Sequence, residues 1–521
     1  MNIVIVAGGL GTRFKELSVF PKILLPTKEN DSLLFEQLGY MNGAKSISII
    51  INTKFYRMLK NYVEVNNINI NIIESKVSNG SYNSINEVKD LLPQENVFFM
   101  WSDILFKQTN IDIVSFIKSN VSLTKPVIFT TSNNSIYRYN FDGNKIESRN
   151  VIQNGNVPGS YFIPNVTEFF KSGYRDGMNY DVIDELRFNW KDIEQCEFPE
   201  LIEYKDVDTY KSIIRQLKPI YNKTRFFNSI TKTDHNTMVK KLEDPAYKNV
   251  ITNEITWYSE LSKNLNGYNP SPIFYGANKD NTSFEMEYLD GYISLYQFLN
   301  ENKPDSNTIK YIYNNIYEGM EILHNSNKKE IQFNVFMQDL YREVVEKIIE
   351  RCDKIPNMII NYNKSKMIKL LVKAYAILLD TTPTTENGNV MYYFCHGDVH
   401  NSNIMINPNT LDIKFIDPRN YFGRTSNLGN LDYEFAKLLY SILGFDHINN
   451  NKLVYLADEV EVENHISDVS FLNNINYKIW SAITFIGLAG YTSGDIMRCN
   501  IAYDYGMKLI EQYINEYYES K

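Results

Sequence analysis

The pattern of apolar residues changes character once along the chain, near Leu217-Lys218-Pro219. Before this point, short apolar runs alternate with helical patterns, which is typical of a mainly parallel sheet covered by helices on both faces. After it, the chain reads as short strands with one helix and then as a long series of helices. A chain of 521 residues is also too long for one core of ordinary size. The sequence therefore predicts two domains, residues 1–218 and residues 219–521, the second with a small lobe (219–290) and a helical lobe (291–521).

The first domain is expected to form a sheet whose strands and helices can be read directly from the apolar runs. The expected strands cover residues 3–7, 46–52, 69–74, 97–101 and 126–130, and the expected helices cover 33–41 and 84–91. In the second domain we expect strands at 237–242, 392–395 and 413–416, and helices at 249–261, 308–325, 334–352, 364–379 and 433–443. Ligands of open parallel sheets bind beyond the carboxyl ends of the strands, so the residues that follow the first strands are the ones to inspect.

A glycine-rich loop follows the first expected strand. It reads Gly8-Gly9-Leu10-Gly11-Thr12-Arg13, and Pro21-Lys22 comes shortly after it. Glycine lets the backbone approach a phosphate closely, and the N–H groups of such a loop form an anion cradle. Arg13 and Lys22 add cations that can bind a polyphosphate.

This stretch resembles the sugar-phosphate and cholinephosphate nucleotidyltransferases, over roughly the first two hundred residues. The resemblance implies a Rossmann-like fold and attack of a phosphomonoester on the α-phosphate of a nucleoside triphosphate, with release of pyrophosphate. It implies Arg13 and Lys22 as catalytic residues and Mg²⁺ held by Asp103 and by Asp208, with Asp206 as the alternative to Asp208. The implied nucleotide-binding positions are Ala7, Gly8, Gly9, Gly11, Thr12, Gly80 and Ser81.

A second motif lies far downstream, at His396-Gly397-Asp398-Val399-His400-Asn401-Ser402-Asn403, and Asp417 follows the next expected strand. Phosphoryl transfer from ATP needs an aspartate that orients the acceptor hydroxyl, an asparagine for one Mg²⁺ and a second aspartate for the metal ions. Asp398, Asn403 and Asp417 have this order and spacing. The sequence therefore indicates a phosphotransferase site in the second domain.

From about Arg225 onward the chain resembles the choline kinase and aminoglycoside phosphotransferase family, in which the motif His-Gly-Asp-x-His-x-x-Asn is characteristic. The resemblance implies a bilobal, protein-kinase-like fold with ATP between the lobes, Asp398 as catalytic base, and Asn403 and Asp417 on Mg²⁺. His324 and His396 are expected to be structural hydrogen-bonding residues.

The small lobe should supply a lysine for the ATP phosphates and a glutamate that pairs with it. Lys240 and Lys241 are adjacent on one expected strand, so they point to opposite faces and only one can serve. We favour Lys240 over Lys241, with Glu254 as its partner. Glu287, in Met286-Glu287-Tyr288-Leu289, lies where the backbone would bind adenine.

Arg419 departs from the choline kinase pattern, because those enzymes typically carry an aromatic and an acidic residue after the metal-binding aspartate. If it faced the acceptor, Arg419 would repel a quaternary ammonium and suit a hydroxylated or anionic group. Trp257 and Trp480 could contribute to a cation-binding cage, but core packing is their expected role.

Composition excludes several classes of function. The net charge of -9 argues against non-specific nucleic-acid binding, which needs a basic surface. Four scattered cysteines indicate neither a disulfide framework nor a zinc motif and fit a reducing cytoplasm. The first strand lacks the basic leader of a signal peptide, and the apolar run at 482–491 is too short to span a bilayer.

The sequence thus predicts a cytoplasmic, bifunctional enzyme with Mg²⁺ as cofactor. It phosphorylates a small alcohol with ATP and then transfers a nucleotidyl group, CMP from CTP by resemblance to bacterial fusion proteins, to give a CDP-choline-like or CDP-ethanolamine-like product for a surface polysaccharide such as a capsule. One alternative is the same two steps on a sugar or polyol. A second alternative is that one domain is only a binding or regulatory module. Small molecules are the expected partners, and the oligomeric state is left open.

Overall fold

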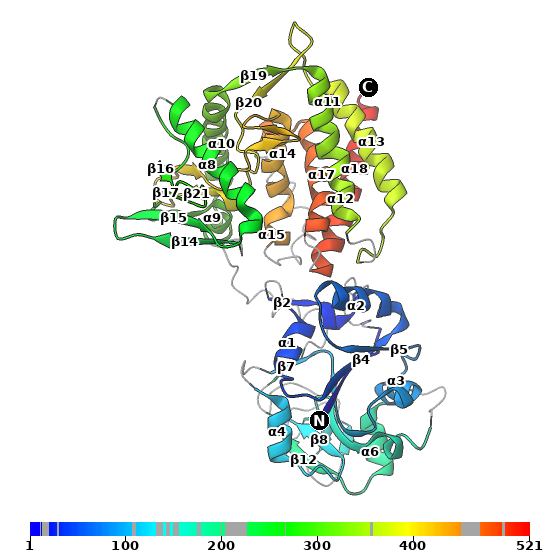
Figure 1. Ribbon diagram of the computed structural model, residues 1–521. Coiled ribbons are helices and arrows are strands. Elements are labelled where there is room, and N and C mark those ends of the chain that lie inside the picture. Colours follow the sequence, from blue (N-terminus) through cyan, green and yellow to red (C-terminus); the bar gives the residue numbers. More distant parts are fainter. Residues whose placement is uncertain are drawn as a thin grey trace. The chain divides into compact units, whose positions relative to one another are not determined.

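The computed structural model describes residues 1–10, 12, 20–28, 31–106, 111–131, 139–141, 146–148, 156–173, 179–198, 201–203, 227–265, 267–354, 358–449, 469–491 and 495–521. The chain divides into two compact units (Figure 1). The first consists mainly of Met1–Lys218, and the second comprises Pro219–Ser493 and Arg498–Lys521.

The first unit is built on a seven-stranded sheet with the strand order β12-β8-β11-β6-β1-β4-β5. Its strands are β1 (Asn2–Ala7), β4 (Ser46–Asn52), β5 (Asn71–Ser75), β6 (Glu95–Trp101), β8 (Val127–Thr130), β11 (Ser160–Asn165) and β12 (Glu194–Glu197). β6, β1, β4 and β5 are parallel neighbours, and β12 is parallel to β8. β11 runs antiparallel to both β6 and β8. The sheet is therefore mainly parallel, as expected, but it contains one antiparallel strand that the apolar pattern did not indicate.

The central strand β1 fixes the edge at which a ligand can approach. Ile3, Val4 and Ile5 are fully buried, as expected for a strand covered on both faces. In the parallel register Ala7 pairs with Ile51, and Val6 pairs with Trp101. The carboxyl ends of β1, β4 and β6 therefore meet at one edge of the sheet.

Helices and short strands complete the first unit. The helices are α1 (Leu33–Gly39), α2 (Thr53–Val65), α3 (Ser81–Val88), α4 (Ile113–Asn120), α5 (Val166–Phe169) and α6 (Val182–Asn189), with 3-10 turns η2 (Lys22–Leu24) and η3 (Lys89–Leu91). The short strands are β2 (Pro26–Lys28), β3 (Asp31–Ser32), β7 (Ile104–Phe106), β9 (Tyr139–Phe141), β10 (Ile146–Ser148) and β13 (Leu201–Glu203). Asn52 caps α2 by accepting from the N–H of Lys54 at 3.0 Å, and Asp112 caps α4 in the same way through Val114 at 3.0 Å.

The second unit begins with an antiparallel sheet in the order β14-β15-β17-β16. Its strands are β14 (Asn228–Lys232), β15 (Thr237–Leu242), β16 (Phe274–Ala277) and β17 (Ser283–Glu287), and helix α8 (Lys248–Asn264) follows the short turn η4 (Pro245–Tyr247). The buried face of α8 includes Ile251, Tyr258 and Leu261, at spacings of seven and three residues that place them on one side of the helix.

The remainder of the second unit is mainly helical. Its helices are α9 (Leu295–Asn302), α10 (Ser306–Ser326), α11 (Phe333–Tyr341), η5 (Arg342–Glu346), α12 (Lys347–Cys352), α13 (Lys364–Thr381), η6 (Asn401–Asn403), α14 (Leu431–Tyr440), η7 (Ser441–Phe445), α15 (Asp446–Asn449), η9 (Ser470–Leu472), α17 (Ile475–Tyr491) and α18 (Ile496–Glu519). Short paired strands lie among them: β18 (Ile293–Ser294), β19 (Lys328–Ile331), β20 (Val390–Tyr393), β21 (Ile404–Ile406), β22 (Ile413–Phe415), β23 (Tyr421–Phe422) and β24 (Thr425–Ser426). Within the described residues, no helix is both long and apolar enough to cross a membrane.

Candidate functional sites

In the first unit, the structure brings Lys22 and Asp103 together. Lys22 opens the turn η2 after Pro21, and Asp103 follows β6. The Nζ of Lys22 lies 2.8 Å from Oδ2 of Asp103, and Asp103 is 5% exposed. A buried carboxylate needs a partner of opposite charge or a metal ion, and here the lysine supplies that charge.

The turn that carries Asp103 is held by a residue that the sequence did not single out. Gln37, on α1, donates from Nε2 to the carbonyl of Trp101 at 3.1 Å and to that of Ile104 at 2.9 Å. Gln37 is fully buried, so these bonds fix the backbone on both sides of the aspartate. A polar residue on the inner face of an otherwise apolar helix was the available signal.

The glycine loop after β1 approaches helix α3. A Cβ on Gly8 would lie 3.1 Å from Oγ of Ser84, which is a tight contact. Gly80 has φ +110°, and a Cβ there would lie 2.1 Å from the carbonyl oxygen of Tyr180. Gly8 and the first turn of α3 therefore lie close together, and the role of Gly80 in binding a base stays a prediction.

Ser81 is engaged within the protein. Asp181 accepts from the N–H of Ser81 at 2.8 Å and from its hydroxyl at 3.1 Å. Asp181 was not identified from the sequence, although it lies directly before the helix α6.

The remaining predicted positions of the first unit divide into two groups. Ala7 is buried at the end of β1, whereas Gly9 and Thr12 are exposed. Gly11, Arg13, Asp206 and Asp208 lie outside the described residues, so the choice between Asp206 and Asp208 stays a prediction.

In the second unit, Lys240 joins two carboxylates that are distant in the sequence. Its Nζ lies 2.6 Å from Oε1 of Glu254 and 2.7 Å from Oδ1 of Asp417. Lys240 and Glu254 are each 3% exposed. Burial alone would lower the pKa of Lys240, but the two carboxylates outweigh it and raise this pKa above its usual value.

The neighbouring Lys241 is in a different environment. Its side chain is 62% exposed and lies 3.8 Å from Glu243. The alternation of side chains along β15 therefore places Lys240, rather than Lys241, on the face that meets α8.

Asp398 lies in a loop fixed by hydrogen bonds and by a lysine. The Nζ of Lys437, on α14, is 3.0 Å from Oδ1 of Asp398, and Nε2 of His400 is 3.8 Å from its Oδ2. Asn403 donates from Nδ2 to the main-chain carbonyl of Asp398 at 3.0 Å. Lys437 was missed from the sequence, because nothing in the spacing links it to a residue on another element.

His396 and Glu434 hold the start of this loop. His396 is fully buried, and its Nε2 lies 2.7 Å from the carbonyl oxygen of Ile416. Burial lowers the pKa of His396 to about 4, so the ring is neutral at pH 7. Glu434 accepts from the N–H of His396 at 2.8 Å and from that of Gly397 at 2.6 Å. These contacts are structural, in keeping with the role expected for His396.

Asp417 has an unusual backbone. Its φ is +59°, in the left-handed region that residues other than glycine rarely adopt. Residues of this kind gather at functional sites, and the carboxylate of Asp417 lies 2.7 Å from the Nζ of Lys240.

Glu287 ends β17, and its N–H donates to the carbonyl of Ile273 at 2.8 Å. This N–H is therefore used inside the sheet and is not free to bind a base. The adjoining main chain at Tyr288 and Leu289 is the remaining candidate in the segment.

Arg419 is paired with a buried carboxylate. Its Nη2 lies 2.5 Å from Oε1 of Glu343, on η5, and it also donates to the hydroxyl of Tyr433. Burial would raise the pKa of Glu343, but Arg419 and Lys347 together hold this pKa well below its usual range. The charge of Arg419 is therefore balanced within the protein by Glu343.

The two tryptophans considered for a cation cage are core residues. Trp257 is fully buried and donates from Nε1 to the carbonyl of Cys395 at 3.0 Å, and Trp480 is 2% exposed and packs against Tyr433.

The donor atoms at both sites fit Mg²⁺. Asp103 in the first unit, and Asn403 and Asp417 in the second, offer oxygen atoms, which are the ligands that Mg²⁺ prefers. Each aspartate already lies beside a lysine that is suited to phosphate oxygens.

Comparison with known proteins identifies the first unit. Residues 2–139 match the sequence model of a family described as "Nucleotidyl transferase". The chain therefore carries an N-terminal nucleotidyltransferase domain with a Rossmann-like, mainly parallel sheet. No curated protein matches the sequence.

The chain is also similar, over 42% of its length, to several solved structures. The inositol-1-phosphate CTP transferase from T. maritima is 11% identical, with a TM-score of 0.34, over 42% of this chain and 97% of that chain. HddC from Yersinia pseudotuberculosis is 20% identical, with a TM-score of 0.34, over 42% and 99% of the two chains. The CTP:phosphocholine cytidylyltransferase LicC from Streptococcus pneumoniae is 19% identical, with a TM-score of 0.33, over 42% and 99%.

Proposed function

We propose that the protein is a bifunctional enzyme that phosphorylates a small alcohol in its second unit and activates the resulting phosphomonoester in its nucleotidyltransferase domain. In the first step the γ-phosphoryl group of ATP passes to the acceptor oxygen, giving ADP, and the hydroxyl proton is released. In the second step a phosphate oxygen of the ester attacks the α-phosphorus of a nucleoside triphosphate, and pyrophosphate leaves. By resemblance the nucleotide is CTP and the product is CDP-choline-like or CDP-ethanolamine-like, for a surface polysaccharide.

The observation that carries the kinase step is the position of Lys240 between Glu254 and Asp417. These three residues come from β15, α8 and the turn after β22, and protein kinases use a lysine–glutamate pair beside a metal-binding aspartate. Lys240 would bind phosphate oxygens of ATP while Glu254 keeps its ammonium group in place. Mg²⁺, when bound, would neutralise the charge of the phosphates.

Asp398 would orient the acceptor hydroxyl and accept its proton. Its carboxylate is held on one side by Lys437, and its main-chain carbonyl accepts from Asn403. The loop therefore presents the base in a fixed orientation, which lowers the entropic cost of reaching the reactive geometry.

In the nucleotidyltransferase domain, Lys22 would bind the triphosphate, and Asp103 would hold the metal ion. Their charged groups are 2.8 Å apart. Asp103 follows β6, and the end of β6 pairs with the end of β1, so both charges lie at that edge of the sheet. A sugar or polyol in place of an amino alcohol remains the alternative acceptor, and a catalytically silent second unit remains the alternative architecture.

The decisive experiment supplies full-length protein with ATP, CTP and one acceptor at a time from choline, ethanolamine, glycerol, ribitol and common sugars. We expect ADP and pyrophosphate to form in equal amounts with one acceptor. Asp398→Asn should abolish ADP formation but retain pyrophosphate release from the supplied phosphoester, and Lys22→Ala should do the reverse. Absence of acceptor-dependent ADP formation with the whole panel would count against the kinase step.

A further inference from the structure

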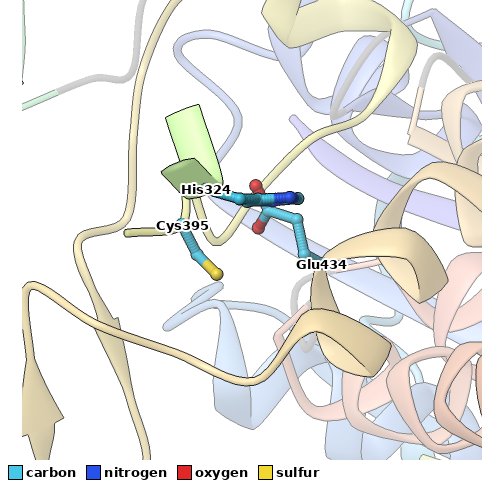
Figure 2. A group of neighbouring side chains, drawn as sticks. All are labelled: His324, Cys395 and Glu434. Atoms are coloured by element: carbon cyan, nitrogen blue, oxygen red, sulfur yellow. The ribbon is translucent and has the colours of Figure 1, made fainter. Parts of the chain in front are cut away.

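Three side chains with metal-binding atoms converge in the second unit, beneath the loop that carries Asp398. They are His324 near the end of α10, Cys395 two residues after β20, and Glu434 on α14. Their ligand atoms all lie within 4.8 Å of one another, and all three residues are buried (Figure 2). Because the residues come from three separate elements, no spacing in the sequence could have revealed the cluster.

One of the three groups has a buried nitrogen without a hydrogen-bond partner, and another is a buried carboxylic group for which the described residues show no ion pair. His324 is 5% exposed, and its Nε2 has no hydrogen-bond partner in the described part of the chain. Glu434 is fully buried and accepts only from two main-chain N–H groups, with no ion pair among the described residues. A buried imidazole nitrogen without a bond and a buried carboxylate without a cation are both unfavourable.

We propose that His324, Cys395 and Glu434 form a binding site for a zinc-like divalent cation. One cation would give the histidine nitrogen a partner and the carboxylate a compensating charge, and Cys395 would bind as thiolate after releasing its proton to solvent. Imidazole, thiolate and carboxylate together suit Zn²⁺, whereas Mg²⁺ prefers oxygen ligands alone. The site is therefore chemically distinct from the magnesium sites of the proposed reactions.

Binding requires a modest contraction of the cluster. Ligand atoms of a tetrahedral zinc ion are roughly 3.5 Å apart, given bond lengths of about 2.0–2.3 Å, whereas the atoms here spread to 4.8 Å. The three protein ligands leave the fourth position of the tetrahedron for water or another small ligand. Rotation of the three side chains is the movement expected on binding, since their elements are already packed together.

The position of the site suggests what the ion would control. The carboxylate of Glu434 also accepts from the N–H groups of His396 and Gly397, the two residues that precede Asp398. A cation bound to Glu434 would therefore restrain the loop of Asp398 through these two hydrogen bonds.

The test uses full-length protein stripped with a chelator and then titrated with Zn²⁺ or Co²⁺. We expect one ion per chain, and with Co²⁺ the near-ultraviolet charge-transfer band of a cobalt–thiolate bond. Cys395→Ser should lose both. Cys352→Ser is the matched control, because Cys352 is also a free buried cysteine of this unit but lies on α12, and it should bind as wild type.

A second variant keeps the test decisive if Cys395→Ser does not fold. The triple variant Cys196→Ser, Cys352→Ser, Cys499→Ser leaves Cys395 as the only thiol and should retain the full cobalt band. Absence of a bound ion in folded wild-type protein, or a thiolate band that this triple variant loses, would overturn the proposal. The readout is metal stoichiometry and absorption, so it does not depend on ATP-dependent phosphorylation, and either proposal can fail alone.

Discussion

Replacing Lys240 by methionine should destabilise the second unit strongly, because it leaves two carboxylates without their shared cation. Glu254 is 3% exposed, and the Nζ of Lys240 lies 2.6 Å from it and 2.7 Å from Asp417. Removing one partner of a buried pair costs about 3–5 kcal/mol. The side chain of Asp417 is 27% exposed and can recover some hydration, so we expect the lower end, about 3 kcal/mol.

The measurement is urea unfolding of the full chain, followed by hydrogen exchange of peptides from 237–264. Lys241→Met is the matched control, since this adjacent lysine is 62% exposed and its contact with Glu243 is 3.8 Å long. The control should change the free energy of unfolding by less than about 0.5 kcal/mol. Equal losses in the two variants, or an unchanged Lys240→Met protein, would refute the argument from burial.

The pH dependence gives a further check with a definite sign. The two carboxylates raise the pKa of Lys240 in the folded state. A lysine with a raised pKa contributes its full stabilisation below its unfolded pKa of about 10.4 and loses it as the pH rises through the folded pKa. The difference between wild type and Lys240→Met should therefore be constant from about pH 7 to 9 and narrow only above about pH 10.4.

Other substitutions test individual contacts. Gly80→Ala should destabilise the first unit by more than about 2 kcal/mol in thermal or urea unfolding, because the new Cβ would lie 2.1 Å from the carbonyl oxygen of Tyr180. Gly43→Ala is the control: this glycine also has a positive φ but has open space around it, so the change should cost about 1 kcal/mol. Lys437→Gln should lower the kcat of ATP-dependent phosphorylation by about 100-fold, whereas the control Lys437→Arg keeps the positive charge and should lose less. The KM for ATP should change little, because Lys437 contacts Asp398, at 3.0 Å, and is not part of the Lys240 cluster. Gln37→Leu should weaken nucleotidyl transfer and leave phosphorylation unchanged, because only the Asp103 turn loses its two hydrogen bonds.

Much of the fold could be predicted because the apolar pattern carries it. The strand expected at 46–52 coincides with β4, and the one expected at 237–242 coincides with β15. The antiparallel β11 was not predicted, since strand direction is set by pairing with β6 and β8 and leaves no local pattern. The helix expected at 334–352 contains a π-helical segment, Arg342–Glu346, that carries the buried Glu343.

For the candidate sites as well, local patterns could be predicted from the sequence and contacts between distant elements could not. Residues within one motif, such as Asp398 and Asn403, could be named from their spacing. Residues that act from another element could not: Lys437, Gln37 and Asp181 meet the motif residues only after folding. Lys240 is buried and Lys241 is exposed, as alternation along a strand leads one to expect, and the role of Lys240 in binding ATP stays a prediction.

The pairing of Arg419 changes how the acceptor pocket should be interpreted. From the sequence, an arginine two residues after Asp417 argues against a cationic acceptor. In the structure, the carboxylate of Glu343 forms an ion pair with this guanidinium, and the Cζ of Arg419 lies 3.9 Å from the centre of the Tyr421 ring. A charge that is neutralised by a buried carboxylate and stacked on an aromatic face repels a distant cation weakly. Arg419 therefore no longer favours a sugar or polyol over choline or ethanolamine, and the acceptor panel, rather than the residue's charge, must decide between them.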